Sequence, residues 1–197
     1  GNDTLASIEG VIGSDHADTL TGNGGANTLI GGEGADTVNG DGGSDSILGG
    51  NGADVLTTGS GTDTIRGGDD NDTIISNVND IGDALYGDAG ADSILANGGS
   101  DTIDGGEGAD TINADIGSNS VSGGGGADSI WAGGNGDTID GGEGADSIRA
   151  GGGNNSVSGG GGADSISAGG EADTIDGGEG DDTIFSSVGN DSLLGGN

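Results

Sequence analysis

The chain contains no proline, cysteine or methionine, and its aromatic residues are one tryptophan, one tyrosine and one phenylalanine. Without cysteine, disulfide staples and thiolate zinc sites are excluded. With so few large side chains, a thick globular interior cannot be filled. We therefore expect one domain or an elongated repeat with a narrow core, held together by something other than disulfides.

Positive charge is also nearly missing. Arg66 and Arg149 are the only lysine or arginine residues, against 35 acidic ones, and the formal net charge is -33. Such a field repels phosphate backbones and anionic membrane surfaces, so we expect no nucleic acid partner and no membrane insertion. Some external cation must balance the carboxylates when the chain becomes compact.

Other classes of protein are disfavoured by what is missing. His16 is the only histidine, so neither a histidine metal cluster nor a histidine-based triad can form, and we predict no enzyme and no catalytic residue. The sequence shows no signal peptide and no apolar run long enough for a bilayer. We expect an excerpt or a mature region of a secreted protein.

The chain does have 53 glycines and a repeat of nine residues. Almost every unit begins with Asp, and one unit, at 72–82, has eleven residues and predicts a bulge or small loop. The third position of every unit is aliphatic. These aliphatic residues are Val11, Leu20, Leu29, Val38, Ile47, Leu56, Ile65, Ile74, Leu85, Ile94, Ile103, Ile112, Val121, Ile130, Ile139, Ile148, Val157, Ile166, Ile175, Ile184 and Leu193.

Each unit predicts a three-residue strand followed by a six-residue turn. The aliphatic residue at the strand centre faces one side and its two neighbours face the other. A flexible glycine-rich linker is the alternative, but a linker gains nothing from an aliphatic residue at one fixed position. We expect disorder only in the metal-free state.

The unit Gly-Gly-x-Gly-x-Asp-x-U-x, with U aliphatic, resembles the nonapeptide of the repeats-in-toxin (RTX) family, and the resemblance extends from Glu9 onward. It implies an all-β fold, a right-handed parallel β-roll with two nonapeptides in each 18-residue coil and about ten coils. Residues 1–8 would form a leading segment or partial coil, and 9–197 one continuous roll.

The resemblance also implies calcium between successive turns, bound by turn carbonyl oxygens and aspartate carboxylates. The composition agrees, because calcium takes six to eight oxygen ligands and glycine lets carbonyls point inward. Aspartates stacked at strand spacing would repel each other unless a divalent ion lay between them. Calcium ions are therefore the predicted cofactor and partner.

Alternate turns should fall on opposite edges of the roll. All seven perfect hexapeptides lie on what we call the first edge, and its predicted ligands are Asp18, Asp36, Asp54, Asp72, Asp92, Asp110, Asp128, Asp146, Asp164 and Asp182 with Gly31, Gly49, Gly105, Gly123, Gly141, Gly159 and Gly177. The second edge is degenerate. Its candidate ligands are Asp45, Asp63, Asp101, Asp137 and Asp173.

Asn27, Asn119 and Asn155 replace aspartate on the second edge, which keeps an oxygen but removes a charge. Ala or Ser at the first position of its turns is expected to restrict the backbone. We therefore predict weaker calcium binding there, or none at some steps.

The predicted function is structural: a calcium-dependent roll of a secreted bacterial surface protein, such as an adhesin, an S-layer subunit or an extracellular fibre, which folds on calcium outside the cell. The alternative is the non-catalytic C-terminal calcium module of a type I-secreted enzyme, such as a protease, lipase or polysaccharide epimerase. Head-to-tail self-association, or continuation in a longer chain, is a further expectation.

Overall fold

The computed structural model describes residues 2–4, 9–77 and 81–197, and its regular structure there is entirely β. It contains two parallel sheets of 11 strands, one built from odd-numbered and one from even-numbered strands. Each strand pairs with the strand two places further along the chain. The all-β, parallel prediction is confirmed.

The strands fall into two sets. The odd-numbered sheet contains β1 (Asn2–Thr4), β3 (Thr19–Asn23), β5 (Thr37–Gly42), β7 (Val55–Ser60), β9 (Thr73–Ile75), β11 (Ser93–Leu95), β13 (Thr111–Asn113), β15 (Ser129–Trp131), β17 (Ser147–Gly151), β19 (Ser165–Ala168) and β21 (Thr183–Ser186). The even-numbered sheet contains β2 (Gly10–Ile12), β4 (Thr28–Glu33), β6 (Ser46–Asn51), β8 (Thr64–Asp69), β10 (Ala84–Ala89), β12 (Thr102–Glu107), β14 (Ser120–Gly125), β16 (Thr138–Glu143), β18 (Ser156–Ser158), β20 (Thr174–Asp176) and β22 (Ser192–Leu194).

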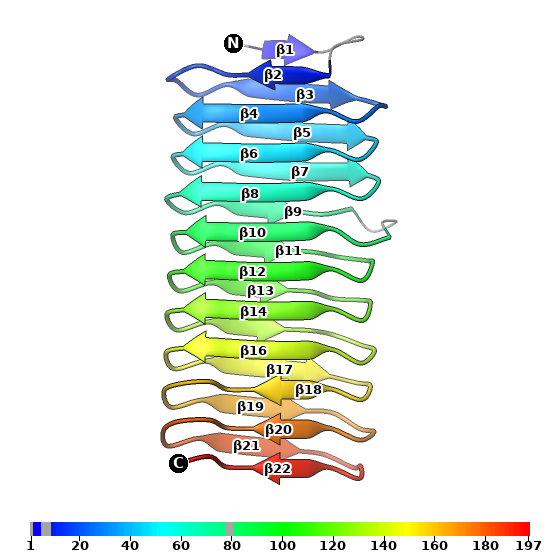
Figure 1. The fold of residues 1–197 in the computed structure, drawn as a ribbon, viewed down its shortest axis with the longest axis vertical. Helices are drawn as coiled ribbons and strands as arrows, with labels where there is room; N and C mark the ends of the chain where they lie inside the picture. Colours follow the sequence, from blue (N-terminus) through cyan, green and yellow to red (C-terminus); the bar gives the residue numbers. More distant parts are fainter. Residues whose placement is uncertain (1, 5–8, 78–80) are drawn as a thin grey trace.

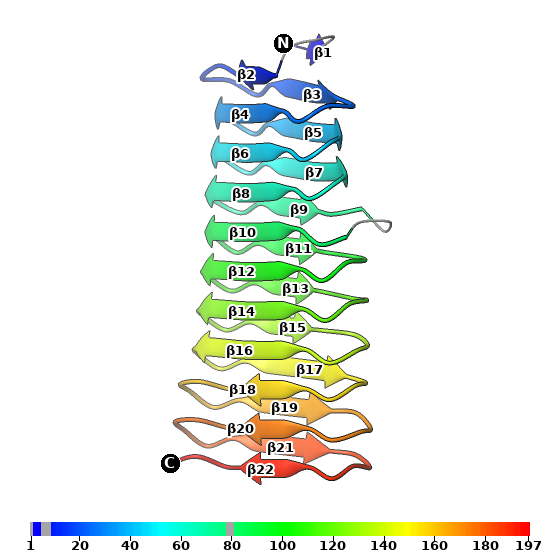
Figure 2. The same ribbon diagram turned by 45° about the vertical axis from the view of Figure 1, so that its right-hand side comes forward.

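The chain winds as a tall, flattened coil (Figure 1). Even-numbered strands lie in front and run to the left, odd-numbered strands lie behind and run to the right, and the chain descends, which makes the winding right-handed. The turns form two edges that remain separate when the molecule is rotated (Figure 2). Leu29 pairs with Ile47 across neighbouring coils, a separation of 18 residues, as the paired nonapeptides predict.

The core is a narrow layer of aliphatic side chains between the two sheets, to which each sheet contributes one column. The central residue of nearly every strand is at most 3% exposed, from Leu20 to Ile175, whereas Val11 and Ile184 are partly buried and Leu193 is 52% exposed. Because its neighbours in the strand face outward, most strands contribute one such side chain, and β17 and β19 also bury Ala150 and Ala168. The predicted narrow core is confirmed.

The prediction of three-residue strands is wrong for much of the roll. Many strands have six residues, such as β4 and β16, and extend into the first half of the following turn. The reason is that turns stack as closely as strands do. Gly32 pairs with Gly50 and Glu33 with Asn51, so the parallel ladder continues past the aliphatic residue.

The eleven-residue unit does not break the roll. Ile65 of β8 pairs with Leu85 of β10, a separation of 20 residues, and Ile74 pairs with Leu56 and Ile94 on either side. The two additional residues are therefore accommodated at the second edge, between β9 and β10. Residues 78–80 of the predicted bulge lie outside the described residues, as do residues 1 and 5–8 of the predicted leading segment.

Candidate metal centre

The turns place their backbone in conformations that favour glycine. In the turn 31–36, the second and fourth positions have φ of 117° at Gly32 and 112° at Gly34. The non-glycine residues that have positive φ at these two positions are Asp, Asn or Glu, as with Asp41 (φ 73°) and Asn135 (φ 83°). Asp and Asn are the non-glycine residues that tolerate this region best. Positions two and four therefore shape the turn.

The last residue of each first-edge turn is an aspartate with a fixed orientation. On the first edge, its backbone N–H donates to Oδ1 of the aspartate in the next coil, at 2.7 to 2.9 Å, from the Asp18–Asp36 pair to the Asp164–Asp182 pair. One carboxylate oxygen is thus used to link two coils. The other oxygen, Oδ2, points back into its own turn.

These Oδ2 atoms are buried and have no hydrogen-bond partner. On the first edge they belong to Asp36, Asp54, Asp72, Asp92, Asp110, Asp128, Asp146, Asp164 and Asp182. A buried carboxylate oxygen without a partner is costly unless an unseen cation or proton satisfies it. Asp18 differs, because its Oδ2 accepts from the N–H and the hydroxyl of Ser14 at 2.6 and 2.7 Å.

Glycine at the first turn position leaves room beside each Oδ2. A Cβ built on Gly31 would overlap Oδ2 of Asp36 and the carbonyl oxygen of Gly49 in the next coil. Equivalent pairs surround the predicted glycines Gly49, Gly105, Gly123, Gly141, Gly159 and Gly177. A carboxylate oxygen from one coil and a carbonyl oxygen from the next therefore converge on one cradle.

The donors in the cradle suit a hard cation. They are all oxygen atoms, the type that calcium prefers, and several must come from the main chain. In the part of the chain that the structure describes, no three His, Asp or Glu side chains gather to hold a metal ion by themselves. The cradle therefore fits calcium, with one carboxylate from each turn and carbonyl groups around it.

Comparison with protein-family models gives the same answer. The model of the RTX calcium-binding nonapeptide repeat matches eight segments, most of them overlapping, that together span residues 12–197. The chain belongs to the RTX calcium-binding nonapeptide repeat family. No curated protein matches it.

Sequence reasoning missed some RTX cradles. Gly67 and Gly87 on the first edge, and Gly40 on the second, face the same carboxylate and carbonyl pair as the predicted glycines. The full motif does not predict them, because their hexapeptides depart from Gly-Gly-x-Gly-x-Asp at other positions. Glycine at the first position alone would have identified them.

Burial changes the acidity of these RTX aspartates. Loss of hydration raises the pKa of Asp72 to about 7 and that of Asp54 and Asp110 to about 6, and a neighbouring aspartate adds to each shift. The donated N–H of the preceding coil opposes the rise. Burial also raises the pKa of Asp146. Without a cation, the charged form of these stacked first-edge aspartates is therefore disfavoured.

The second edge keeps the link between coils, but from Thr58 onward its turns have no glycine at the first position to form the cradle. Its N–H to Oδ1 bonds run from the Asn27–Asp45 pair to the Asp173–Asp191 pair at 2.6 to 3.0 Å and include the predicted ligands Asp63, Asp101 and Asp137. Buried Oδ2 atoms without a hydrogen-bond partner include those of Asp45, Asp137 and Asp173.

Alanine at the first position of second-edge turns has a different role from the one expected. Ala96, Ala114, Ala132 and Ala150 are fully buried and belong to the hydrophobic core. The first position is not where the backbone is strained; positions two and four are. Alanine therefore fills space rather than restricting the backbone, and it extends the core into the region where the first edge keeps an open cradle.

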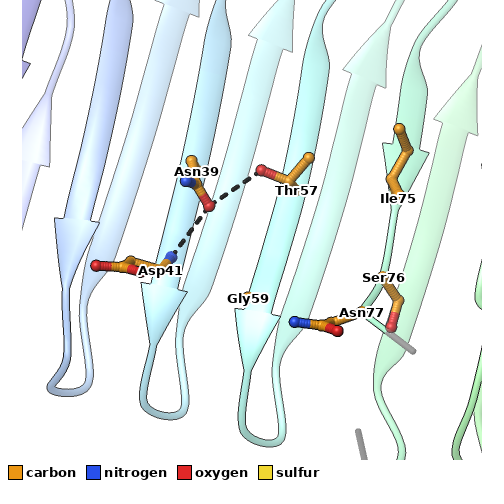
Figure 3. Close-up of a pocket in the computed structure, with 7 residues that line it drawn as sticks. All are labelled: Asn39, Asp41, Thr57, Gly59, Ile75, Ser76 and Asn77. Atoms are coloured by element: carbon orange, nitrogen blue, oxygen red, sulfur yellow. Dashed lines mark hydrogen bonds between the residues drawn. The ribbon is translucent and has the colours of Figure 1, made fainter. Parts of the chain in front are cut away.

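A hollow of about 440 Å³ lies on the outer surface near the eleven-residue unit (Figure 3). Oδ1 of Asn39 accepts from the Thr57 hydroxyl and the Asp41 N–H, each at 3.1 Å. The Ser76 hydroxyl donates to Asp83 at 2.7 Å. Asn39, Thr57 and Ser76 thus already bond groups of the protein itself. Among the described residues no helix is long and apolar enough to cross a membrane.

Proposed function

We propose that this chain is a structural roll that folds on calcium, part of a secreted bacterial surface protein such as an adhesin, an S-layer subunit or an extracellular fibre. The observation behind the proposal is the column of buried, unpartnered Oδ2 atoms on the first edge, each beside an open glycine cradle. Nine consecutive coils repeat it, from Asp36 to Asp182. A repeated scaffold for ions suits a structural element.

The proposed ligands are the Oδ2 atoms of the first-edge aspartates and the carbonyl oxygens around the first-position glycines. Each ion would join two coils, because its two kinds of ligand come from successive turns. Beside Gly31, for example, they are Oδ2 of Asp36 and the carbonyl oxygen of Gly49 in the next coil. Second-edge aspartates such as Asp45, Asp137 and Asp173 are proposed as ligands only where their Oδ2 lacks another partner. Asp18 is a weaker candidate because Ser14 already bonds its Oδ2.

Calcium binding would be coupled to folding. Each strand buries one aliphatic side chain, and the net charge of -33 opposes compaction, so the metal-free chain has little to offset its conformational entropy. Calcium outside the cell would supply the missing free energy, as metal ions do in other small metal-dependent domains. Low calcium inside the cell would leave the chain unfolded during export.

Two further parts of the proposal concern context. Secretion is supported by the family, whose repeats are typical of secreted proteins. Head-to-tail self-association or continuation in a longer roll remains a prediction.

Circular dichroism with and without a chelator tests the proposed function. We expect the β signal to be lost on chelation and restored by calcium. Magnesium is the matched control, because it demands a tighter octahedral shell and should restore much less signal. An unchanged β signal in the metal-free chain would exclude calcium-coupled folding.

A further inference from the structure

Two turns of the second edge differ from all first-edge turns in what occupies their interior. They are 114–119 and 150–155, and each ends in asparagine where the repeat has aspartate. Both Asn119 and Asn155 are 3% exposed, as deeply buried as the aspartates. Each therefore places an amide where the first edge places a carboxylate.

Asn155 retains the link between coils. Its Oδ1 accepts the N–H of Asp137 at 2.9 Å, and its own N–H donates to Oδ1 of Asp173 at 2.9 Å. The difference lies in the second side-chain atom. Its Nδ2 donates to the carbonyl of Gly153 at 3.2 Å and to Oδ1 of Asp173 at 3.0 Å. It thus bonds one turn carbonyl and one carboxylate.

Asn119 follows the same pattern at longer distances. Its Oδ1 accepts the N–H of Asp101 at 2.9 Å, and its Nδ2 lies 3.4 Å from the carbonyl oxygen of Ala114 and 3.5 Å from that of Gly117. Carbonyl and carboxylate oxygens are the ligands that calcium takes. In both turns an amide nitrogen donates to groups of this kind.

The first position of these two turns supports the same conclusion. Ala114 and Ala150 are fully buried there, whereas glycine leaves the cradle open on the first edge. A methyl group at this position reduces the space for an ion. Ala132 brings the same methyl group to a turn that ends in Asp137, so it is the amide that sets these two turns apart.

From this geometry we infer that the amides of Asn119 and Asn155 replace calcium, so that these two turns are closed by the protein's own hydrogen bonds and take up no ion. The inference rests on the proposed function, because it assumes that comparable turns on the first edge bind calcium. It makes the roll asymmetric: the first edge depends on calcium from Asp36 to Asp182, and the second edge is partly independent of it.

Counting the calcium bound to the full chain tests this inference. Asn155→Asp restores a carboxylate and removes the donor, so bound calcium should rise by about one ion per chain. Asn154→Asp is the matched control. It is one residue away, exposed, and makes the same charge change, while its Oδ1 can still accept the N–H of Ala172. We expect no additional ion in this control.

Thermal unfolding supplies a second measurement. Asn155→Asp should unfold at a lower temperature than the wild type in low calcium and recover in excess calcium. Asn155→Ala, which loses the amide without gaining a ligand, should be destabilised at every calcium concentration. Recovery of one variant and not of the other would support the inference.

Two results would overturn it. If Asn155→Asp binds no more calcium than Asn154→Asp while the wild type still folds on calcium, the amide is not what keeps calcium out and the inference fails alone. If the wild type binds no calcium at all, the proposed function fails and the inference fails with it. The calcium content of the wild-type chain distinguishes these cases.

Discussion

At the scale of single residues, each nonapeptide assigns separate tasks to a few positions. Glycine at the first turn position provides space, and positions two and four provide a backbone with positive φ. Aspartate links two coils through Oδ1 and presents Oδ2 to the turn interior. The period of nine predicts that aspartate and glycine act together at each turn. The separate roles of the two carboxylate oxygens could not be predicted, because they depend on how successive coils stack.

A methyl group in a first-edge cradle should impair calcium binding. In Gly123→Ala the new Cβ would overlap Oδ2 of Asp128 and the carbonyl of Gly141, so we expect weaker calcium binding and a lower unfolding temperature in calcium. Gly134→Ala is the control, since a Cβ there meets nothing within 4 Å and its φ is not positive. Equal effects in calcium-dependent melting curves would contradict the role given to the cradle.

Loss of a first-edge carboxylate should matter more than loss of a second-edge amide. We expect Asp146→Ala to raise the calcium midpoint of folding by roughly two- to fivefold, because one shared ion loses its charged ligand. Asn155→Ala should shift the midpoint less, since the amide it loses bonds a turn carbonyl and a carboxylate and, by our inference, holds no ion. Calcium titrations followed by circular dichroism measure both, and equal shifts would refute the asymmetry.

At the scale of strands and edges, stability comes from stacking. Each strand has one buried aliphatic residue, such as Ile139 at 2% exposed, and gains its contacts from the coils on either side. Repeats of this kind depend mainly on neighbouring interfaces. A weak coil therefore affects the coils next to it.

Shortening a buried aliphatic side chain of the core should lower the stability of the roll. Ile139→Ala should lower the free energy of unfolding in saturating calcium by about 2–5 kcal/mol, the usual range for a buried Ile. Ile116→Ala is the matched control, because Ile116 is 63% exposed. Denaturant titration compares the two variants. A similar loss of unfolding free energy in both would show that the buried aliphatic residues are not the core.

Acid should partly replace calcium. Burial raises the folded-state pKa of Asp72 to about 7 and of Asp54 to about 6, above the ordinary value of 3.8. The folded state therefore binds more protons between pH 4 and 7, so its stability falls as pH rises through this window. The metal-free chain should gain β structure when pH is lowered from 7.5 to 4.5. A chain equally unfolded at both values would contradict these shifts.

At the scale of the whole molecule, the sequence predicted most of the architecture. The invariant aliphatic position predicts two sheets and a narrow core, and the spacing of 18 residues between paired positions follows from two units in each coil. The register after the eleven-residue unit was less predictable, because only the ladder shows that Ile65 pairs with Leu85. The closed turns at Asn119 and Asn155 also required the structure, since an asparagine in the sequence could equally remain a ligand.

In the proposed function, calcium ions stacked along the first edge offset part of the net charge of -33. Arg66, one of the two arginines, pairs at 2.7 Å with Asp88, the second residue of the turn 87–92, rather than with an aspartate that ends a turn. The positive charge that balances the carboxylates must therefore come mainly from cations outside the chain. A rod whose cohesion is set by external calcium is the consequence at this scale.

Anomalous X-ray scattering from crystals grown in calcium tests the central claim most directly. We predict calcium peaks between successive first-edge turns, within about 2.3–2.6 Å of the Oδ2 atoms from Asp36 to Asp164, and no peak in the turns 114–119 and 150–155. An ordered roll without peaks along the first edge would contradict the account.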